Sequence, residues 1–186
     1  PDPDSHMNVA IFLDAVAVAG RSDLLDDVKK QLVALVRGEP VYLAHFARAI
    51  DLFPTPIGFF NNIITKDGDG DAVDLKKGGI FPIVHGVRSL ALEKGIIAET
   101  RTDARIARLA EMGVLKEDFG RELTQAFWLL MTLRLDSQNA ARASGSGSLL
   151  RPGELTVMER DLLRGAFQVV KRFRELIRHH FNLGVF

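Results

Sequence analysis

Apolar residues recur along most of the chain with the period of three to four residues that is typical of an amphipathic α-helix. The pattern predicts six helices, most of which begin after serine, threonine or proline and end before glycine or proline. They cover residues 22–38, 41–53, 80–94, 102–113, 117–142 and 156–181. The expected fold class is therefore mainly α, with residues from about 80 to 182 packed as an antiparallel helical bundle.

A different pattern is found from Val9 to Val18, where a nearly continuous apolar run ends shortly before Gly20. Such a run is typical of a strand that is buried on both faces of a sheet. The seven residues before Asn8 are typical of an expression-tag remnant and do not enter the fold prediction. We therefore expect residues 8–20 to be a strand left from a preceding domain, and residues 21–186 to form a helical domain.

A second β pattern surrounds a glycine-rich turn. Residues 57–65 are rich in isoleucine, phenylalanine and threonine, and the turn at 66–71 follows them. The pattern predicts a small β-hairpin over about residues 57–76. The acidic turn also resembles the start of a calcium-binding loop, but Ala72 and Gly78 stand where such a loop requires glycine and glutamate. A plain hairpin turn is the favoured interpretation.

Composition adds exclusions. Of 186 residues, 24 are Lys or Arg and 24 are Asp or Glu, so no net charge attracts nucleic acid or an anionic membrane. Any anion site has to be a local cluster. The absence of cysteine excludes disulfides and thiolate metal sites, and it is consistent with the reducing cytoplasm. No apolar run is long enough to span a membrane, so we expect a cytoplasmic protein without membrane or nucleic-acid partners.

Three arginines interrupt the apolar stripes of three different predicted helices: Arg88, Arg134 and Arg160. An arginine directed into a bundle is costly unless a carboxylate or a bound anion neutralises it. One interpretation is a structural network, with partners among Glu93, Asp136, Glu159 and Asp161. The other is a cluster of guanidinium groups that binds phosphate, with Gln138 and Glu159 beside it. Under both interpretations we expect the three arginines to converge on one polar spot.

Four motifs, taken in order, point to a family. They are Asp74-Leu-Lys76 with Gly78-Gly-Ile80 and Arg88, Thr102-x-x-Arg105-Ile106, Leu133-Arg-Leu135-x-x-Gln138, and Leu155-Thr156-x-x-Glu159-Arg160. Together they resemble the C-terminal substrate-binding domain of bacterial nucleotidyltransferases fused to CBS or cyclic-nucleotide-binding sensor domains. Those proteins are similar to the uridylyltransferase that modifies the PII signalling protein. The resemblance extends over nearly all of the chain from Ile11 to Phe181.

The resemblance implies an accessory domain of a signal-transduction nucleotidyltransferase. The parent protein would use Mg²⁺ and a nucleoside triphosphate to modify a protein or a small-molecule acceptor. It also implies that the strand at residues 8–20 closes the catalytic domain, with Asp14 as a candidate metal ligand. Because no Asp-x-Asp pair beside Gly-Ser is found, we expect this chain alone to be inactive and to hold neither cofactor.

The resemblance also suggests which residues bind the substrate or nucleotide. The candidates are Lys76, Arg88, Arg105, Arg134, Gln138, Glu159 and Arg160. The expected partners are the catalytic and sensor domains, and a homodimer could form through the unpaired edge of the N-terminal strand. The alternative function is a helical protein–protein interaction or dimerisation module that binds no small ligand.

Overall fold

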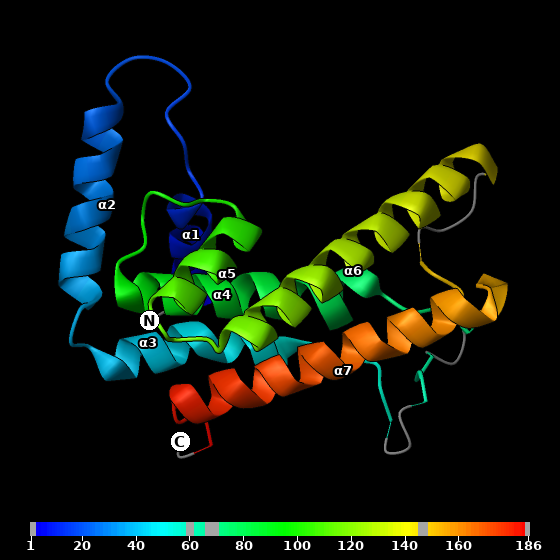
Figure 1. The fold of residues 1–186 in the computed structure, drawn as a ribbon. Coiled ribbons are helices and arrows are strands. Elements are labelled where there is room, and N and C mark those ends of the chain that lie inside the picture. The colour runs from blue at the N-terminus through cyan, green and yellow to red at the C-terminus, as the bar shows by residue number, and fades with distance from the viewer. Residues whose placement is uncertain (1–2, 59–61, 66–70, 145–148, 185–186) are drawn as a thin grey trace. The chain divides into compact units, whose positions relative to one another are not determined.

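The computed structural model describes residues 3–58, 62–65, 71–144 and 149–184. Over these residues it contains seven α-helices and no β-strand (Figure 1). The α-helices are α1 (Pro3–Leu13), α2 (Ser22–Val36), α3 (Pro40–Ala47), α4 (Phe81–Lys94), α5 (Thr102–Glu111), α6 (Glu117–Ser144) and α7 (Val157–His180). Shorter elements are the 3-10 helices Arg48–Leu52 and Pro152–Glu154 and the π-helix Lys76–Ile80. The predicted mainly α class is therefore confirmed.

All six helices predicted from the hydrophobic period are present as α2 to α7. Five of them end within about two residues of the predicted positions, because the capping residues mark the ends. Gly38 (φ +86°) and Gly113 (φ +70°) adopt the left-handed conformation just after α2 and α5. The exception is α3, which becomes a 3-10 helix after Ala47 and is followed by Pro54.

The predicted N-terminal strand is wrong, because α1 occupies the first half of the apolar run, up to Leu13, and the second half is irregular. A run of this length fits a buried strand or a buried helix equally well. A helix satisfies its backbone hydrogen bonds internally, and no described strand offers a partner. Ala10 and Leu13, three residues apart, are 0% and 1% exposed, whereas Ile11 is 64% exposed. The strand edge on which the expected homodimer depended is therefore not found.

The predicted hairpin is also wrong over the residues that can be described. Ile57 forms one antiparallel bridge with Ile63, but Val73 pairs with Leu150 instead of with residues 57–65. The Val73 N–H donates to the Leu150 carbonyl at 2.7 Å, and the Leu150 N–H donates back at 3.2 Å. Lys76, predicted as the end of the second strand, begins the π-helix. Part of the turn, residues 66–70, lies outside the described residues.

Two glycines hold that π-helix close to its neighbours. A Cβ atom on Gly78 would lie 2.5 Å from Cδ of Pro56, and one on Gly79 would lie 2.9 Å from Cδ1 of Leu130. A side chain on Gly78 would clash with Pro56, and one on Gly79 would press on Leu130 of α6. Gly79 therefore allows the segment that begins with Lys76 to pack close to this helix.

The chain forms two compact units, which are described separately. The first contains residues up to Ala49, then 84–120 and the residues from Ile177 onward. The second contains residues 50–83 and 121–176. Within the second unit, α6 and α7 are antiparallel neighbours, since Arg172 near the end of α7 donates to Glu122 near the start of α6 at 2.8 Å.

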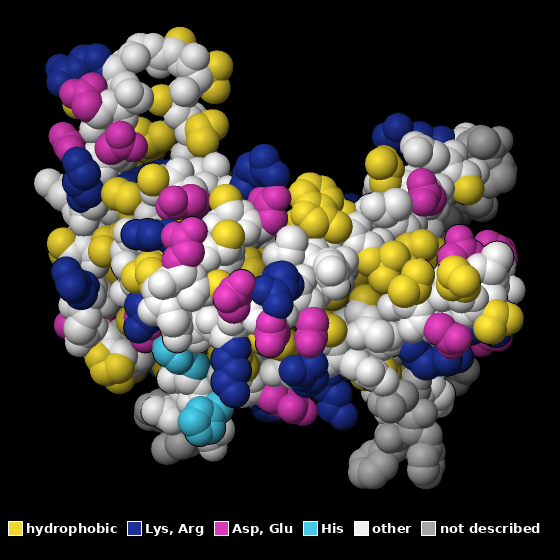
Figure 2. Space-filling model, viewed as in Figure 1, with side chains coloured by type: hydrophobic (Ala, Val, Ile, Leu, Met, Phe, Trp, Pro, Cys, Tyr) yellow, Lys and Arg dark blue, Asp and Glu magenta, His cyan; other side chains and the backbone are white. Residues whose placement is uncertain are grey.

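Charges of both signs are mixed on the molecular surface. On the face drawn in Figure 2, acidic and basic side chains alternate over short distances. This matches the net charge of zero and leaves local clusters as the places to look for ligand sites. Among the described helices, none has the length and the apolar character needed to cross a membrane.

Candidate functional site

The residues predicted from the sequence fall into two groups, one in each unit. Asp14, Arg88 and Arg105 belong to the first unit, and the others belong to the second. The predicted convergence of Arg88, Arg134 and Arg160 is not found within either unit. Each group has its own geometry and its own electrostatic situation.

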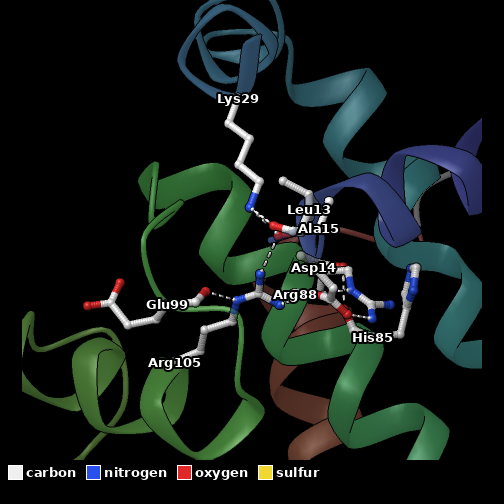
Figure 3. Close-up of polar contacts among 9 residues, drawn as sticks. Leu13, Asp14, Ala15, Lys29, His85, Arg88, Glu99 and Arg105 are labelled. Carbon is white, nitrogen blue, oxygen red and sulfur yellow. Dashed lines mark hydrogen bonds and ion pairs between the residues drawn. The ribbon is translucent and has the colours of Figure 1, made fainter. Parts of the chain in front are cut away.

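In the first unit, the Asp14 carboxylate lies between two arginines (Figure 3). Nη1 of Arg105 donates to Oδ1 of Asp14 at 2.6 Å. Nη2 of Arg88 donates to Oδ2, and its Nε lies 3.4 Å from Oδ1. The Arg105 side chain is only 2% exposed and that of Arg88 is 12% exposed, whereas Asp14 is 35% exposed. One carboxylate at the surface thus serves two arginines that come from α4 and α5.

The same arginines and one lysine also hold the end of α1. Nη2 of Arg105 donates to the Leu13 carbonyl at 3.0 Å, and its Nε donates to the Glu99 carbonyl at 2.7 Å. Nζ of Lys29 donates to the carbonyls of Leu13 and Ala15 at 3.2 and 2.7 Å. The last carbonyls of a helix have no partner within it and carry partial negative charge, so cationic donors stabilise them. We call Asp14, Lys29, Arg88 and Arg105 the Asp14 cluster.

The cluster changes the acid–base properties of its members. Partial burial acts to raise the pKa of Asp14, but the hydrogen bonds and charges of Arg88 and Arg105 hold it below its ordinary value. Burial, followed by the charge of Arg105, lowers the pKa of Lys29. The two arginines thus determine the direction for Asp14, whereas burial is the main cause for Lys29.

This arrangement does not fit Asp14 as a magnesium ligand. Both carboxylate oxygens already accept hydrogen bonds from guanidinium groups, and the nearby cations repel a divalent ion. The described residues also contain no group of three or more His, Asp or Glu side chains that could hold a metal. We therefore assign Asp14 the role of an ion-pair acceptor.

His85 lies one turn before Arg88 on α4, next to the cluster. Its ring is buried, Nε2 donates to the Phe46 carbonyl at 2.7 Å, and the two rings lie 4.8 Å apart between centroids. Burial lowers the pKa of His85 to about 4, so the ring is neutral at physiological pH. It adds no further positive charge to the Asp14 cluster.

Sequence reasoning missed Lys29, although the signal was present. Lys29 continues the apolar spacing of Leu25, Leu32 and Val36 on α2, in the way that the three arginines interrupt their own stripes. It is 2% exposed, as that register predicts. A test for any cation within an apolar stripe, instead of arginine alone, would have found it.

In the second unit, a polar pocket of about 140 Å³ lies between the π-helix and α6. It is lined by Asp74, Leu75, Lys76, Arg134, Gln138 and Leu149, and we call it the Lys76 pocket. Asp74 is engaged locally, because its Oδ1 accepts from the Lys77 N–H at 3.0 Å. Over the described part of the chain, the side chains of Lys76, Arg134 and Gln138 make no hydrogen bond or ion pair. Within the described residues, the pocket thus presents two cations and one amide that have no partner.

Glu159 has a structural partner instead. Its carboxylate accepts from the N–H and the hydroxyl of Thr156 at 2.8 and 2.7 Å, and the Glu159 N–H donates to the same hydroxyl at 3.2 Å. This reciprocal pattern is a capping box at the start of α7. It also lowers the pKa of Glu159 through the bonds from Thr156.

Arg160, the next residue, shares the same helix start. Its Nη2 donates to the Leu155 carbonyl at 3.1 Å, and its Nε is buried without a partner among the described residues. It is not part of the Lys76 pocket lining. The structure therefore places Arg160 at the beginning of α7 together with the capping box.

Comparison with known families gives a match over most of the chain. A family model described as "Putative nucleotidyltransferase substrate binding domain" matches residues 40–181. That range contains the whole Lys76 pocket and both arginines of the Asp14 cluster, whereas Asp14 and Lys29 lie before it. No curated protein and no solved structure matches the chain.

Proposed function

Because the chain belongs to this family of nucleotidyltransferase substrate-binding domains, we propose that it binds an anionic group of the substrate in the Lys76 pocket. The observation that carries the proposal is the pair of cationic side chains, Lys76 and Arg134, which have no partner among the described residues and lie around a polar cavity. A protein rarely leaves a half-buried arginine such as Arg134 unpaired, since the guanidinium group loses hydration there without gaining a counter-ion.

The lining suits a phosphoryl group. The planar fork of Arg134 can donate two parallel hydrogen bonds to phosphate oxygens, and Lys76 adds a compact charge. The Gln138 amide can donate to an oxygen or accept from a ribose hydroxyl. A cavity of about 150 Å³ holds a molecule the size of benzene, so the pocket of about 140 Å³ has room for one phosphoryl group but not for an entire nucleotide.

The domain contributes orientation to the reaction of a larger protein. The parent reaction would be Mg²⁺-assisted transfer of a nucleotidyl group from a nucleoside triphosphate to a protein or small-molecule acceptor. The metal chemistry belongs to a catalytic domain. The same proposal has three further parts: sensor domains of the CBS or cyclic-nucleotide-binding type, similarity to the PII uridylyltransferase, and a cytoplasmic location. Holding a reactant in place accounts for a large share of enzymatic rate enhancement.

The test is calorimetric titration of the chain with ATP and UTP, with and without Mg²⁺. Replacing Arg134 with Met should weaken binding about 10- to 100-fold, because a charged hydrogen-bonding group is worth about 1.5–3 kcal/mol. Lys171→Met is the control, since Lys171 is an exposed cation on α7 of the same unit, does not line the pocket and should not affect binding.

Three results would contradict the proposal: no nucleotide binding by the unmodified chain, equal losses in the two variants, or no loss in Arg134→Met. A chain that binds neither nucleotide would instead favour the alternative of a helical interaction module. Incubation with labelled nucleotide, Mg²⁺ and candidate acceptors should show no transfer by this chain alone.

A further inference from the structure

Arg88 and Arg105 present three N–H donors to a single point. Two come from Arg88 and one from Arg105, and all of them reach the two oxygens of Asp14 (Figure 3). Several guanidinium donors that converge from two helices are the pattern by which proteins bind phosphoryl oxygens. The positions of the arginines are well determined by packing, because their side chains are 12% and 2% exposed.

Two guanidinium groups share one carboxylate at this point. Arg88 and Arg105 both donate to Asp14, whereas Lys29 donates to backbone carbonyls. The charges of Asp26 and Glu99 act on Lys29 and Arg105 without a carboxylate hydrogen bond to them. A phosphate dianion in place of the Asp14 carboxylate would match the two guanidinium charges that contact it.

The arginine pair and the Asp14 carboxylate come from different parts of the sequence. Arg88 and Arg105 lie within residues 40–181, which match the family model, whereas Asp14 lies before them. The matched range thus contains a nearly buried arginine pair whose counter-ion comes from a residue before that range, within the same compact unit. Two such guanidinium groups cannot remain without an anion in a low-dielectric site.

We propose that Arg88 and Arg105 form a phosphoryl-binding site of the domain, separate from the Lys76 pocket, and that the Asp14 carboxylate is its intramolecular occupant. Asp14 is suited to leave, since its side chain is 35% exposed and follows the last residue of α1. The helix itself stays in place, because Ala10 and Leu13 are buried. A phosphorylated ligand therefore competes with one side chain and not with an entire element.

The experiment compares three versions of the full chain: unmodified, Asp14→Ala, and Asp14→Ala combined with Arg88→Met. Thermal unfolding midpoints are measured near neutral pH against inorganic phosphate, with sodium chloride holding the ionic strength constant. At about twenty times its dissociation constant, phosphate should raise the midpoint of Asp14→Ala by roughly 4–7 °C more than those of the other two. The general stabilising effect of phosphate on proteins is common to all three and cancels.

Equal shifts in the three proteins would overturn the proposal. If Asp14→Ala does not fold, the same comparison is made with Asp14→Asn, whose neutral side chain can turn toward solvent. Repeating the comparison with ATP in place of phosphate shows whether the group is free or belongs to a nucleotide. Adding Arg134→Met to each protein separates the two sites, because the difference should persist when the Lys76 pocket is disabled.

Discussion

The Asp14 cluster and the Lys76 pocket contain similar side chains in opposite electrostatic situations. In the Asp14 cluster, the Arg105 side chain is 2% exposed, and its Nε, Nη1 and Nη2 atoms each donate a hydrogen bond to an oxygen acceptor. In the Lys76 pocket, Arg134 is half-buried, and no described residue neutralises it. The first region has its anion built into the chain, whereas the second has space for one.

The difference shows what an arginine within an apolar stripe indicates. The stripe places the side chain against the protein, and this alone does not distinguish a structural ion pair from a ligand site. An arginine of this kind forms a structural ion pair when a carboxylate from another part of the chain packs against it, and it is a candidate ligand site when none does. Asp14 reaches Arg105 across 91 positions of the sequence, and helical periodicity carries no information about such a contact.

The largest expected effect is the loss of Arg105. Replacing it with Met removes the buried partner of Asp14 and leaves the carbonyls of Leu13 and Glu99 without this donor. Breaking a buried pair by removing one partner costs about 3–5 kcal/mol. Urea denaturation should show this loss for Arg105→Met, whereas Arg134→Met should change the free energy of unfolding by less than about 1 kcal/mol. Similar losses in the two variants would remove the contrast between the regions.

Replacing Asp14 with Asn should have the next largest effect, and this effect depends on pH. We expect a loss of about 1–2 kcal/mol near neutral pH, reduced from the usual value for a charged hydrogen bond because Asp14 is one-third exposed. The folded-state pKa of Asp14 lies below its unfolded value of about 3.9, so the carboxylate stabilises the fold above that pH. The stabilisation is lost as the pH falls through the folded-state pKa.

The measurement is the free energy of unfolding of both proteins between about pH 3 and pH 7. The difference between them should be constant above about pH 5 and should shrink toward zero in acid. Burial keeps His85 neutral over most of this range, so it contributes to the difference only near its pKa of about 4. A difference that grows as the pH falls would show that Asp14 is not stabilised by the two arginines.

The sequence predicted the helices well and the rest of the fold poorly, for physical reasons. Helices α2 to α7 depend on local periodicity and capping residues, which the sequence displays directly. The run at Val9–Val18 and the segment around Val73 depend on pairing partners, and Val73 pairs with Leu150 across 77 positions. For such segments, the local pattern permits two answers, and tertiary contacts decide between them.

The candidate site was predictable to a similar degree. The residues Arg88, Arg105, Arg134 and Gln138 were identified from stripes and motifs, and the structure places all of them in polar clusters or a pocket. Glu159 was identified for the same reason but serves a helix start. Glu159 follows Thr156 by three residues at the start of a helical run, and this spacing is the capping-box signature. A capping role for Glu159 is therefore a simpler interpretation than a role in the substrate site.

The capping box gives a smaller effect that tests this distinction. Thr156→Ala removes the hydroxyl that accepts from the Glu159 N–H, and loss of such a cap costs about 1 kcal/mol. Glu159→Gln keeps a hydrogen-bonding side chain and should leave nucleotide affinity unchanged in the calorimetric titration. A clear loss of nucleotide affinity in Glu159→Gln would instead show that Glu159 takes part in substrate binding.

The smallest expected effect belongs to Lys76, at the rim of its pocket. Lys76 is exposed, so its charge acts on a bound phosphoryl group through water and salt and not in a dry cavity. Interactions of this kind are worth about 0.2–1 kcal/mol, which corresponds to a loss of affinity of roughly two- to fivefold for Lys76→Gln. The loss should decrease as sodium chloride is added, whereas the larger loss in Arg134→Met should persist, because Arg134 is half-buried and its fork also donates directed hydrogen bonds.

Lys116→Gln is the matched control, since Lys116 is an exposed lysine in the first unit. If Lys76→Gln and Lys116→Gln weaken binding equally, only the overall charge of the protein attracts the nucleotide, and the Lys76 pocket is not the site that binds the phosphoryl group.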